Sequence, residues 1–263
     1  IVVDDGSDSQ FCIDDHLVSS INYSCYYLPR ANDSCRARAR NFGASKAIND
    51  NLIFLDGDQY ANSNLIRAYS DFLHQYPENQ VVLGTRIELS EWQSSLLIKN
   101  ASDEQLARLV SRQVDMREDI RLESERYARN NSNLWIVFWS HNFFISKKLF
   151  FEIDGFDENF KGWGCEDVEL GYRIARLRKA IKLIDNRVYN IGSNEADFHG
   201  KYEDYLKNFL LFFKKYNSID VMFYFSFYES VFFTSYVLPD SLIKKFREFN
   251  DKIKLYGAQD LPL

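Results

Sequence analysis

The stretch Asn51-Leu-Ile-Phe-Leu-Asp-Gly-Asp58 is an apolar run that ends in an acidic turn. Residues 1–7, Ile-Val-Val-Asp-Asp-Gly-Ser, have the same form, so each stretch predicts a buried strand that stops at a turn. Between them, residues 36–48 carry alanines at helical spacing, which predicts a helix with a small face for packing. The order strand, helix, strand indicates an α/β fold in which both acidic turns lie where such sheets bind ligands.

The spacing of apolar side chains predicts the remaining elements. The chain is expected to form one α/β domain over residues 1–200 with a helical insertion at about 90–133, followed by an aromatic, mostly helical C-terminal extension over 201–263. We expect further helices at 65–76, from 166 onward, at 202–216 and at 242–256, and further strands at 81–83, 134–139 and 143–145.

Composition excludes several classes of protein. The 263 residues are 46% hydrophobic with only 11 Gly and 4 Pro, which excludes disordered and collagen-like chains. There are 32 Lys and Arg against 38 Asp and Glu, and this acidic balance argues against a nucleic-acid-binding protein. The four cysteines are far apart and form no zinc or disulfide pattern, so reduced thiols in the cytoplasm are the simpler interpretation.

One segment, Val221 to Leu238, is apolar enough to be considered as a membrane span. It is short and carries Glu229 near its middle, where a carboxylate is costly in a bilayer. We therefore favour a buried or membrane-surface aromatic segment. The expected location is cytoplasmic, with peripheral contact to a membrane or a partner through this extension as an open alternative.

The acidic turn after residues 51–55 can bind a metal ion. In an extended segment, residues i and i+2 face the same way, so Asp56 and Asp58 can direct two carboxylates to one point. Gly57 between them leaves room for a ligand beside the backbone. Two oxygen ligands at this spacing suit Mg²⁺ or Mn²⁺, although a solvated Asp-Gly-Asp turn explains the motif equally simply.

A second cluster of polar residues is Gly162-Trp-Gly-Cys-Glu-Asp167, which precedes a predicted helix. Glycines on both sides of Trp163 leave room for a flat ligand, such as a sugar ring, against the indole. Glu166 and Asp167 fall in the first helical turn, where the helix dipole favours their ionised form, and an ionised carboxylate can act as a general base. The alternative is ordinary helix capping, with the tryptophan in the core.

Taken together, these motifs resemble the nucleotide-sugar-dependent glycosyltransferases of family 2 and their GT-A-fold relatives. The matching segments occur in the family's order: IVVDDGS, RARNFGASKA, IFLDGD, NFFISKKLFFEIDGFDENFKGWGCEDVELGYRI, and then a histidine. The segment GWGCEDVELGYR is also similar to the GWG-x-ED element of β-galactosyltransferases and chondroitin-type polymerases. The resemblance covers residues 1 to about 199 and implies a GT-A fold, a Rossmann-like α/β fold whose mostly parallel sheet is flanked by helices.

The resemblance implies a role for each matching position. Acids after the first strand serve the nucleobase, arginines of the following helix serve the phosphates, and the Glu-Asp pair serves the acceptor. The corresponding residues are Asp5 at the nucleobase and Asp4 in its turn, Arg36 and Arg40 at the nucleotide or its diphosphate, Asp56 at the ribose or metal, Asp58 at the metal, Trp163 and Gly164 in the sugar pocket, Glu166 at the acceptor and Asp167 as the base.

The resemblance also implies a metal-binding histidine downstream of the acidic pair. We favour His199 over His141 for this role, and imidazole suits Mn²⁺ better than Mg²⁺. The family normally has one more strand and helix before the motif at residues 1–7. Either residues before Ile1 are missing or the nucleobase pocket is built differently.

The expected activity is therefore inverting, metal-dependent transfer of a hexose or N-acetylhexosamine from a UDP-sugar to an acceptor hydroxyl, as in polysaccharide biosynthesis. The acceptor can be a glycan, a glycolipid or a protein. Two alternatives stay open, namely a sugar-nucleotide pyrophosphorylase and a non-catalytic carbohydrate- or protein-binding module on the same fold. The first would need a glycine-rich phosphate loop and an activating lysine near residue 1, and the sequence shows neither.

Overall fold

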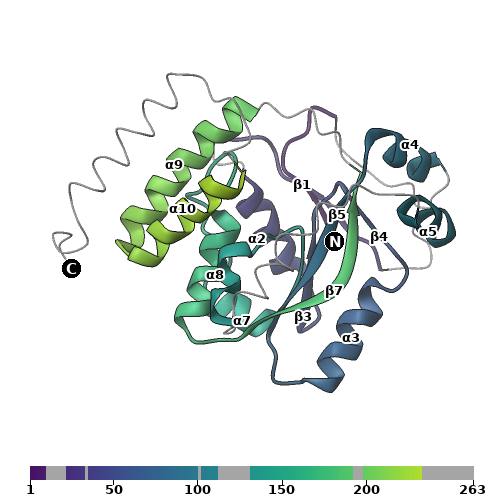
Figure 1. Cartoon of the computed structure of the whole chain (residues 1–263), viewed down its shortest axis with the longest axis horizontal. Helices are drawn as coiled ribbons and strands as arrows, with labels where there is room; N and C mark the ends of the chain where they lie inside the picture. The colour runs from purple at the N-terminus through teal and green to yellow at the C-terminus, as the bar shows by residue number, and fades with distance from the viewer. Residues whose placement is uncertain (10–21, 33–34, 100–101, 112–130, 192–197, 233–263) are drawn as a thin grey trace.

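The computed structural model describes residues 1–9, 22–32, 35–99, 102–111, 131–191 and 198–232. In this part of the chain, a central β-sheet lies between two groups of helices (Figure 1). Helices α2 (Arg36–Lys46), α7 (Lys147–Glu152) and α8 (Glu166–Arg176) lie on one side. On the other side are α3 (Leu65–Gln75), α4 (Glu91–Lys99) and α5 (Asp103–Ser111).

The described strands form two sheets. A parallel pair consists of β1 (Val2–Asp4) and β2 (Cys25–Tyr27). The larger sheet has the order β3-β6-β5-β7-β4. Its strands are β3 (Asn51–Leu55), β4 (Gln59–Ala61), β5 (Val81–Glu88), β6 (Asn142–Ser146) and β7 (Ile181–Asn190).

Strand direction in the larger sheet is mixed. β5 and β7 pair in parallel, whereas β6 pairs antiparallel with both β3 and β5, and β4 pairs antiparallel with β7. Strands β3, β5 and β7 therefore run the same way. Their carboxyl ends meet at one edge of the sheet, and β4 begins at this edge, directly after the acidic turn that follows β3.

Side-chain alternation along the strands gives the sheet its two cores. Val81 and Leu83 of β5 face α2 and α8 in the main core, while Val82 between them faces α3 in a second cluster. A third cluster packs Leu97 of α4 and Leu106 of α5 against the ends of β5 and β7. The first part of the predicted insertion therefore forms α4 and α5, which pack at the ends of these two strands, and residues 112–130 lie outside the described part.

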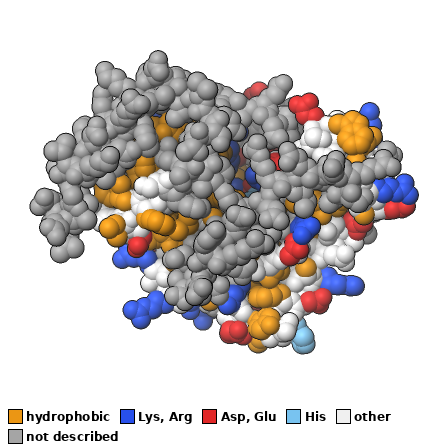
Figure 2. Space-filling model, viewed as in Figure 1, with side chains coloured by type: hydrophobic (Ala, Val, Ile, Leu, Met, Phe, Trp, Pro, Cys, Tyr) orange, Lys and Arg blue, Asp and Glu red, His pale blue; other side chains and the backbone are white. Residues whose placement is uncertain are grey.

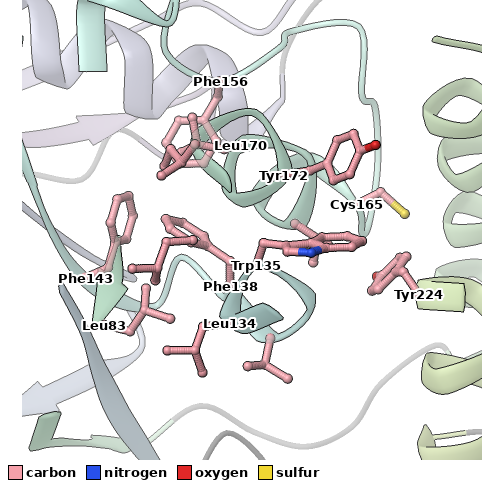
Figure 3. Close-up of a cluster of buried hydrophobic side chains, with 14 of the residues drawn as sticks. Leu83, Leu134, Trp135, Phe138, Phe143, Phe156, Cys165, Leu170, Tyr172 and Tyr224 are labelled. Atoms are coloured by element: carbon pink, nitrogen blue, oxygen red, sulfur yellow. The ribbon is translucent and has the colours of Figure 1, made fainter. Parts of the chain in front are cut away.

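The main core is strongly aromatic and surrounds Trp135 (Figure 3). The Trp135 ring packs edge-on against Tyr172 of α8, with ring centroids 4.8 Å apart. Residues 134–139 were expected to form a strand, and this expectation is wrong, because residues 131–137 form the 3₁₀ helix η1 (Asn131–Val137). Leu134, Trp135 and Val137 are all buried, and a continuous apolar run does not distinguish a strand from a buried helical turn.

The C-terminal extension forms α9 (Phe198–Tyr216) and α10 (Ile219–Phe232), which lie together beside α8 (Figure 1). Tyr205 and Phe209 of α9 belong to the same core cluster as the sheet residues, so these helices are continuous with the α/β core. On the face shown in Figure 2, exposed apolar side chains gather over α9 and α10. Within the described residues, no helix combines the length and apolar character needed to cross a membrane. The helix expected at 242–256 lies outside these residues.

Candidate active site

Each acidic turn follows a strand and is fixed by local hydrogen bonds. Asp4, at the end of β1, is buried, and its Oδ1 accepts a hydrogen bond from the Ser7 backbone N–H at 2.9 Å, which closes the turn. Asp5 forms an ion pair with Arg38 of α2, at 3.2 Å between Arg38 Nη1 and Asp5 Oδ1. Sequence reasoning did not select Arg38, although it lies between Arg36 and Arg40 in the same motif.

Arg40 joins the two acidic segments that the sequence indicated. Its Nη2 donates to Asp56 Oδ1 at 2.9 Å, and its Nη1 donates to Glu166 Oε1 at 3.1 Å. Only 12% of the Arg40 side chain and 9% of the Glu166 side chain are exposed, so this is a largely desolvated cluster. The turn after β3 and the start of α8 therefore share the guanidinium group of Arg40, which lies 126 residues before Glu166 in the sequence. Arg40 is thus paired with acids, and its predicted contact with the donor diphosphate stays a prediction.

The loop before α8 has an unusual backbone, which explains its glycines. Gly162, Gly164 and Cys165 have φ angles of +68°, +94° and +71°, in the region that favours glycine. A Cβ atom on Gly162 would lie 2.0 Å from Asp204 Oδ2, so the loop also needs glycine for space. Arg36 stabilises this loop from the other side, because its Nη1 donates to the Gly162 carbonyl oxygen at 3.0 Å.

Helix α9 holds the loop that carries Trp163. The buried Asn208 Nδ2 lies 2.7, 3.2 and 2.9 Å from the carbonyl oxygens of Lys161, Trp163 and Gly164. The Trp163 ring packs against Tyr205 of α9 and Tyr228 of α10, with both centroid distances at 6.4 Å. Trp163 is half-buried rather than enclosed. Sequence reasoning missed Asn208, because its neighbours in the chain carry no signal of this contact.

The surroundings of Asp167 fix its carboxylate and change its pKa. Its Oδ1 accepts from the Val168 N–H at 2.8 Å and its Oδ2 from the Ser140 N–H at 3.3 Å. Burial and the adjacent Glu166 carboxylate raise the pKa of Asp167 to about 7, against the opposing effect of Arg40 and the two N–H groups. A carboxyl group with this pKa can exchange protons near neutral pH, as a general base requires.

The acidic turn supplies two carboxylates for a metal ion. Asp58 is exposed, Asp56 is half-buried, and a Cβ atom on Gly57 would meet no described atom within 4 Å. The described residues contain no group of three or more His, Cys, Asp or Glu placed to hold a metal. Two carboxylates fit Mn²⁺ or Mg²⁺ when the nucleotide phosphates and water supply the other ligands, as is common for such ions.

The structure describes the side chain of only one of the two candidate histidines. His199 is in the first turn of α9, but its side chain lies outside the described part of the structure, so its predicted metal contact is not described. His141 is buried, and its backbone carbonyl oxygen accepts from the Asp56 N–H at 3.3 Å. His141 therefore supports the acidic turn through its backbone.

Comparisons with known proteins show the family and the fold of this chain. A sequence model described as "Glycosyltransferase like family 2" matches residues 1–230 of the 263. Because the match covers most of the sequence, the chain belongs to that family. Its fold is the GT-A fold: the crystal structure of GalNAc-T7 with UDP, GalNAc and Mn²⁺ has a TM-score of 0.52 at 16% identity, over 99% of this chain and 51% of that chain.

Two further matches are more limited. The crystal structure of S. aureus TarS matches with a TM-score of 0.48 at 17% identity, over 81% of this chain and 33% of that chain. A segment of 40 residues is 50% identical to validoxylamine A glucosyltransferase of Streptomyces hygroscopicus subsp. jinggangensis (strain 5008). That segment is 15% of this chain and 10% of the enzyme, so the sequence likeness to this relative is confined to a small part of both.

Proposed function

We propose that this chain is an inverting, metal-dependent glycosyltransferase that moves a hexose or N-acetylhexosamine from a UDP-sugar to an acceptor hydroxyl. The observation that carries the proposal is the Arg40 fork, in which one guanidinium contacts Asp56 at 2.9 Å and Glu166 at 3.1 Å. It brings the carboxylates suited to the donor's metal ion beside the acids suited to the acceptor. A transferase needs both groups of acids in one site, because the sugar must pass directly from the donor to the acceptor.

Asp167 is the base in this proposal. It takes the proton of the acceptor hydroxyl while that oxygen attacks the anomeric carbon from the face opposite the leaving group. The bond between the anomeric carbon and the diphosphate oxygen breaks in the same displacement, so the configuration inverts. The pKa of about 7 that burial and Glu166 give to Asp167 allows it to be ionised at neutral pH and still accept a proton.

Asp58 and Asp56 are the residues of the described chain that would hold the divalent cation, with His199 as the predicted third ligand. When bound, a divalent cation neutralises the negative charge that develops on the leaving nucleoside diphosphate. Arg40 neutralises Asp56 and Glu166 and keeps the two segments together, and its contact with the donor diphosphate stays a prediction.

Trp163 is the proposed contact for a sugar ring. The loop from Gly162 to Cys165 is held on one side by Arg36 and on the other by Asn208, so the half-buried ring has a fixed position. A rigid, half-buried aromatic ring suits the C–H face of a pyranose. We therefore assign the glycan part of the acceptor, or the transferred sugar, to this side of the site.

The donor class is tested first by ligand binding. Of the structures compared above, GalNAc-T7 holds UDP and Mn²⁺, so UDP-sugars with Mn²⁺ are the first ligands to test. A thermal-shift screen of UDP-glucose, UDP-galactose, UDP-GlcNAc and UDP-GalNAc should give a rise in melting temperature for at least one of them, and only with Mn²⁺ present. A GDP-sugar that stabilises the protein more than any UDP-sugar would contradict the donor assignment.

The catalytic role is tested by substitution. With the donor found in that screen, the wild-type protein should slowly hydrolyse the UDP-sugar without an acceptor, whereas Asp167→Asn should bind the donor but lose about 10²- to 10⁴-fold in rate. Asp71→Asn, an exposed acid on α3, is the matched control and should keep full rate. Donor binding without any turnover in the wild type would favour the binding-module alternative.

A further inference from the structure

Three polar side chains form a row across neighbouring strands at the edge of the sheet where the acidic turn lies. Glu88 of β5 pairs in register with Asn190 of β7, and Asn190 pairs in register with Gln59 of β4. Gln59 directly follows Asp58, so the row ends beside a candidate metal-binding carboxylate. We call Glu88, Asn190 and Gln59 the polar row.

The polar row is a continuous chain of hydrogen bonds. Asn190 Nδ2 donates to Glu88 Oε2 at 2.6 Å, Gln59 Nε2 lies 3.4 Å from Asn190 Oδ1, and the same nitrogen donates to Asp58 Oδ1 at 2.6 Å. Arg86 anchors the far end through an ion pair with Glu88. The shortest contacts are those that involve carboxylates, as expected for charge-assisted hydrogen bonds.

The orientation of the Gln59 amide follows from the chemistry of its partner. An ionised carboxylate accepts hydrogen bonds only, so the amide nitrogen must face Asp58. This orientation leaves the buried Gln59 Oε1 without a hydrogen-bond partner among the described residues. Gln59 and Asn190 are each only 8% exposed, whereas Asp58 is exposed, so a buried and well-anchored amide holds a carboxylate that would otherwise rotate in solvent.

We propose that Gln59 is a positioning residue for the metal site: it fixes the Asp58 carboxylate through Oδ1, which would leave Oδ2 available to a divalent cation. The inference rests on the proposed function, because it assumes a divalent cation at Asp58. Its physical basis is preorganisation, since a ligand that is already held in one rotamer loses less freedom when the metal binds. The sheet register supplies the rigidity, because each member of the polar row is fixed by its strand.

The test measures binding of Mn²⁺ itself in the presence of UDP, by the loss of the free Mn²⁺ signal in electron paramagnetic resonance. Gln59→Leu removes the amide but keeps the volume, and it should weaken Mn²⁺ binding about tenfold or more, in the range found when outer partners of metal ligands are removed. Gln93→Leu is the matched control, because Gln93 is also a buried glutamine, but it accepts from the Ser90 N–H just before α4 and donates to the Leu109 carbonyl oxygen of α5. It should bind Mn²⁺ as the wild type does.

A second variant keeps the test decisive if Gln59→Leu does not fold. Glu88 is about one-third exposed, so Glu88→Ala is better tolerated, and by releasing Asn190 it should weaken Mn²⁺ binding severalfold. Wild-type Mn²⁺ affinity in Gln59→Leu, or in folded Glu88→Ala if Gln59→Leu does not fold, overturns the positioning role alone. Failure of the wild-type protein to bind Mn²⁺ with UDP overturns the proposed metal site, and this inference with it.

Discussion

The Asn208 side-chain amide donates to the Gly164 carbonyl oxygen at 2.9 Å, so a residue 44 positions further along the chain fixes the loop that carries Trp163. The same nitrogen also lies near the carbonyl oxygens of Lys161 and Trp163. A buried amide that contacts three backbone oxygens of one loop restrains the position of that loop. The C-terminal helices are therefore part of the candidate active site.

The close approach of this loop to α9 predicts a strong effect of Gly162→Ala. Its new Cβ atom would lie 2.0 Å from Asp204 Oδ2, and the φ of +68° adds backbone strain of about 1 kcal/mol. We expect Gly162→Ala to lower the free energy of unfolding by about 2–4 kcal/mol. Adding Asp204→Ala should recover most of this loss, apart from the strain. Urea denaturation of both variants measures the recovery, and equal stability of the two would contradict the contact.

The Arg40 fork predicts a large effect on stability. Arg40→Met leaves the Glu166 carboxylate, with 9% of its side chain exposed, without its cationic partner. Breaking a buried ion pair on one side typically costs about 3–5 kcal/mol, and we expect a loss of this size in urea denaturation. Arg40→Lys should recover part of it, because an ammonium keeps the charge but lacks the fork that reaches both acids. A loss below about 1 kcal/mol in Arg40→Met would show that the fork contributes little.

A second buried ion cluster lies behind the site and predicts an effect confined to stability. Glu169 of α8 is fully buried and accepts hydrogen bonds from Arg173 and from Lys215 and Tyr216 at the end of α9. Glu169→Gln removes the negative charge and leaves the cations unbalanced, so we expect a loss of about 3 kcal/mol or more. Donor affinity measured on the folded protein should not change. A tenfold change in that affinity would place Glu169 in the site instead.

The sequence predicted the acidic turns and the helix start at Glu166 because these features depend on neighbouring residues. Strand β3 occupies the expected residues 51–55, and α8 begins at Glu166 as expected. The chain could not reveal β7 in the same way, because Lys182, Asp185 and Arg187 interrupt its apolar pattern. This strand is specified by its pairing with β5 and β4, which is a property of the folded sheet.

The candidate site likewise contains residues that sequence motifs reveal and residues that they do not. Asp56, Asp58, Glu166 and Asp167 lie in recognisable motifs, and the structure brings the two pairs together through Arg40. Arg38, Asn208 and Gln59 were missed, because a single polar residue in a helix or strand has no local pattern that shows what it contacts. A directed search could have found Arg38 and Gln59 from their motif neighbours, but Asn208 depends entirely on the packing of α9 against the loop.

The pKa of Asp167 predicts how activity depends on pH. Because burial and Glu166 raise this pKa to about 7, the base is protonated in mild acid, and kcat/KM should rise with pH and level off above about 8. The positive charge of Arg40 lowers the pKa of Asp167. If an Arg40→Lys variant is active and its ammonium lies farther from Asp167, the increase of kcat/KM should therefore occur at higher pH. The measurement is a profile of donor hydrolysis or transfer from pH 5.5 to 9. A rate independent of pH in this range would exclude Asp167 as the base.

The same pKa predicts that stability and activity change in opposite directions with pH. The folded pKa of Asp167, about 7, lies above the ordinary value of 3.8, so the folded state holds the proton more tightly than the unfolded state. Such a group stabilises the fold fully below its unfolded pKa, and the contribution is lost as pH rises through the folded pKa. Between pH 5 and pH 8, the wild-type free energy of unfolding should therefore fall by about 2–3 kcal/mol more than that of Asp167→Asn. Urea denaturation at both pH values measures how much the free energy of unfolding of each protein changes. Any effect of the substitution that is the same at both pH values cancels in this comparison. If the free energies of unfolding of the two proteins change equally with pH, Asp167 is already ionised at pH 5, and its pKa in the folded protein is not raised.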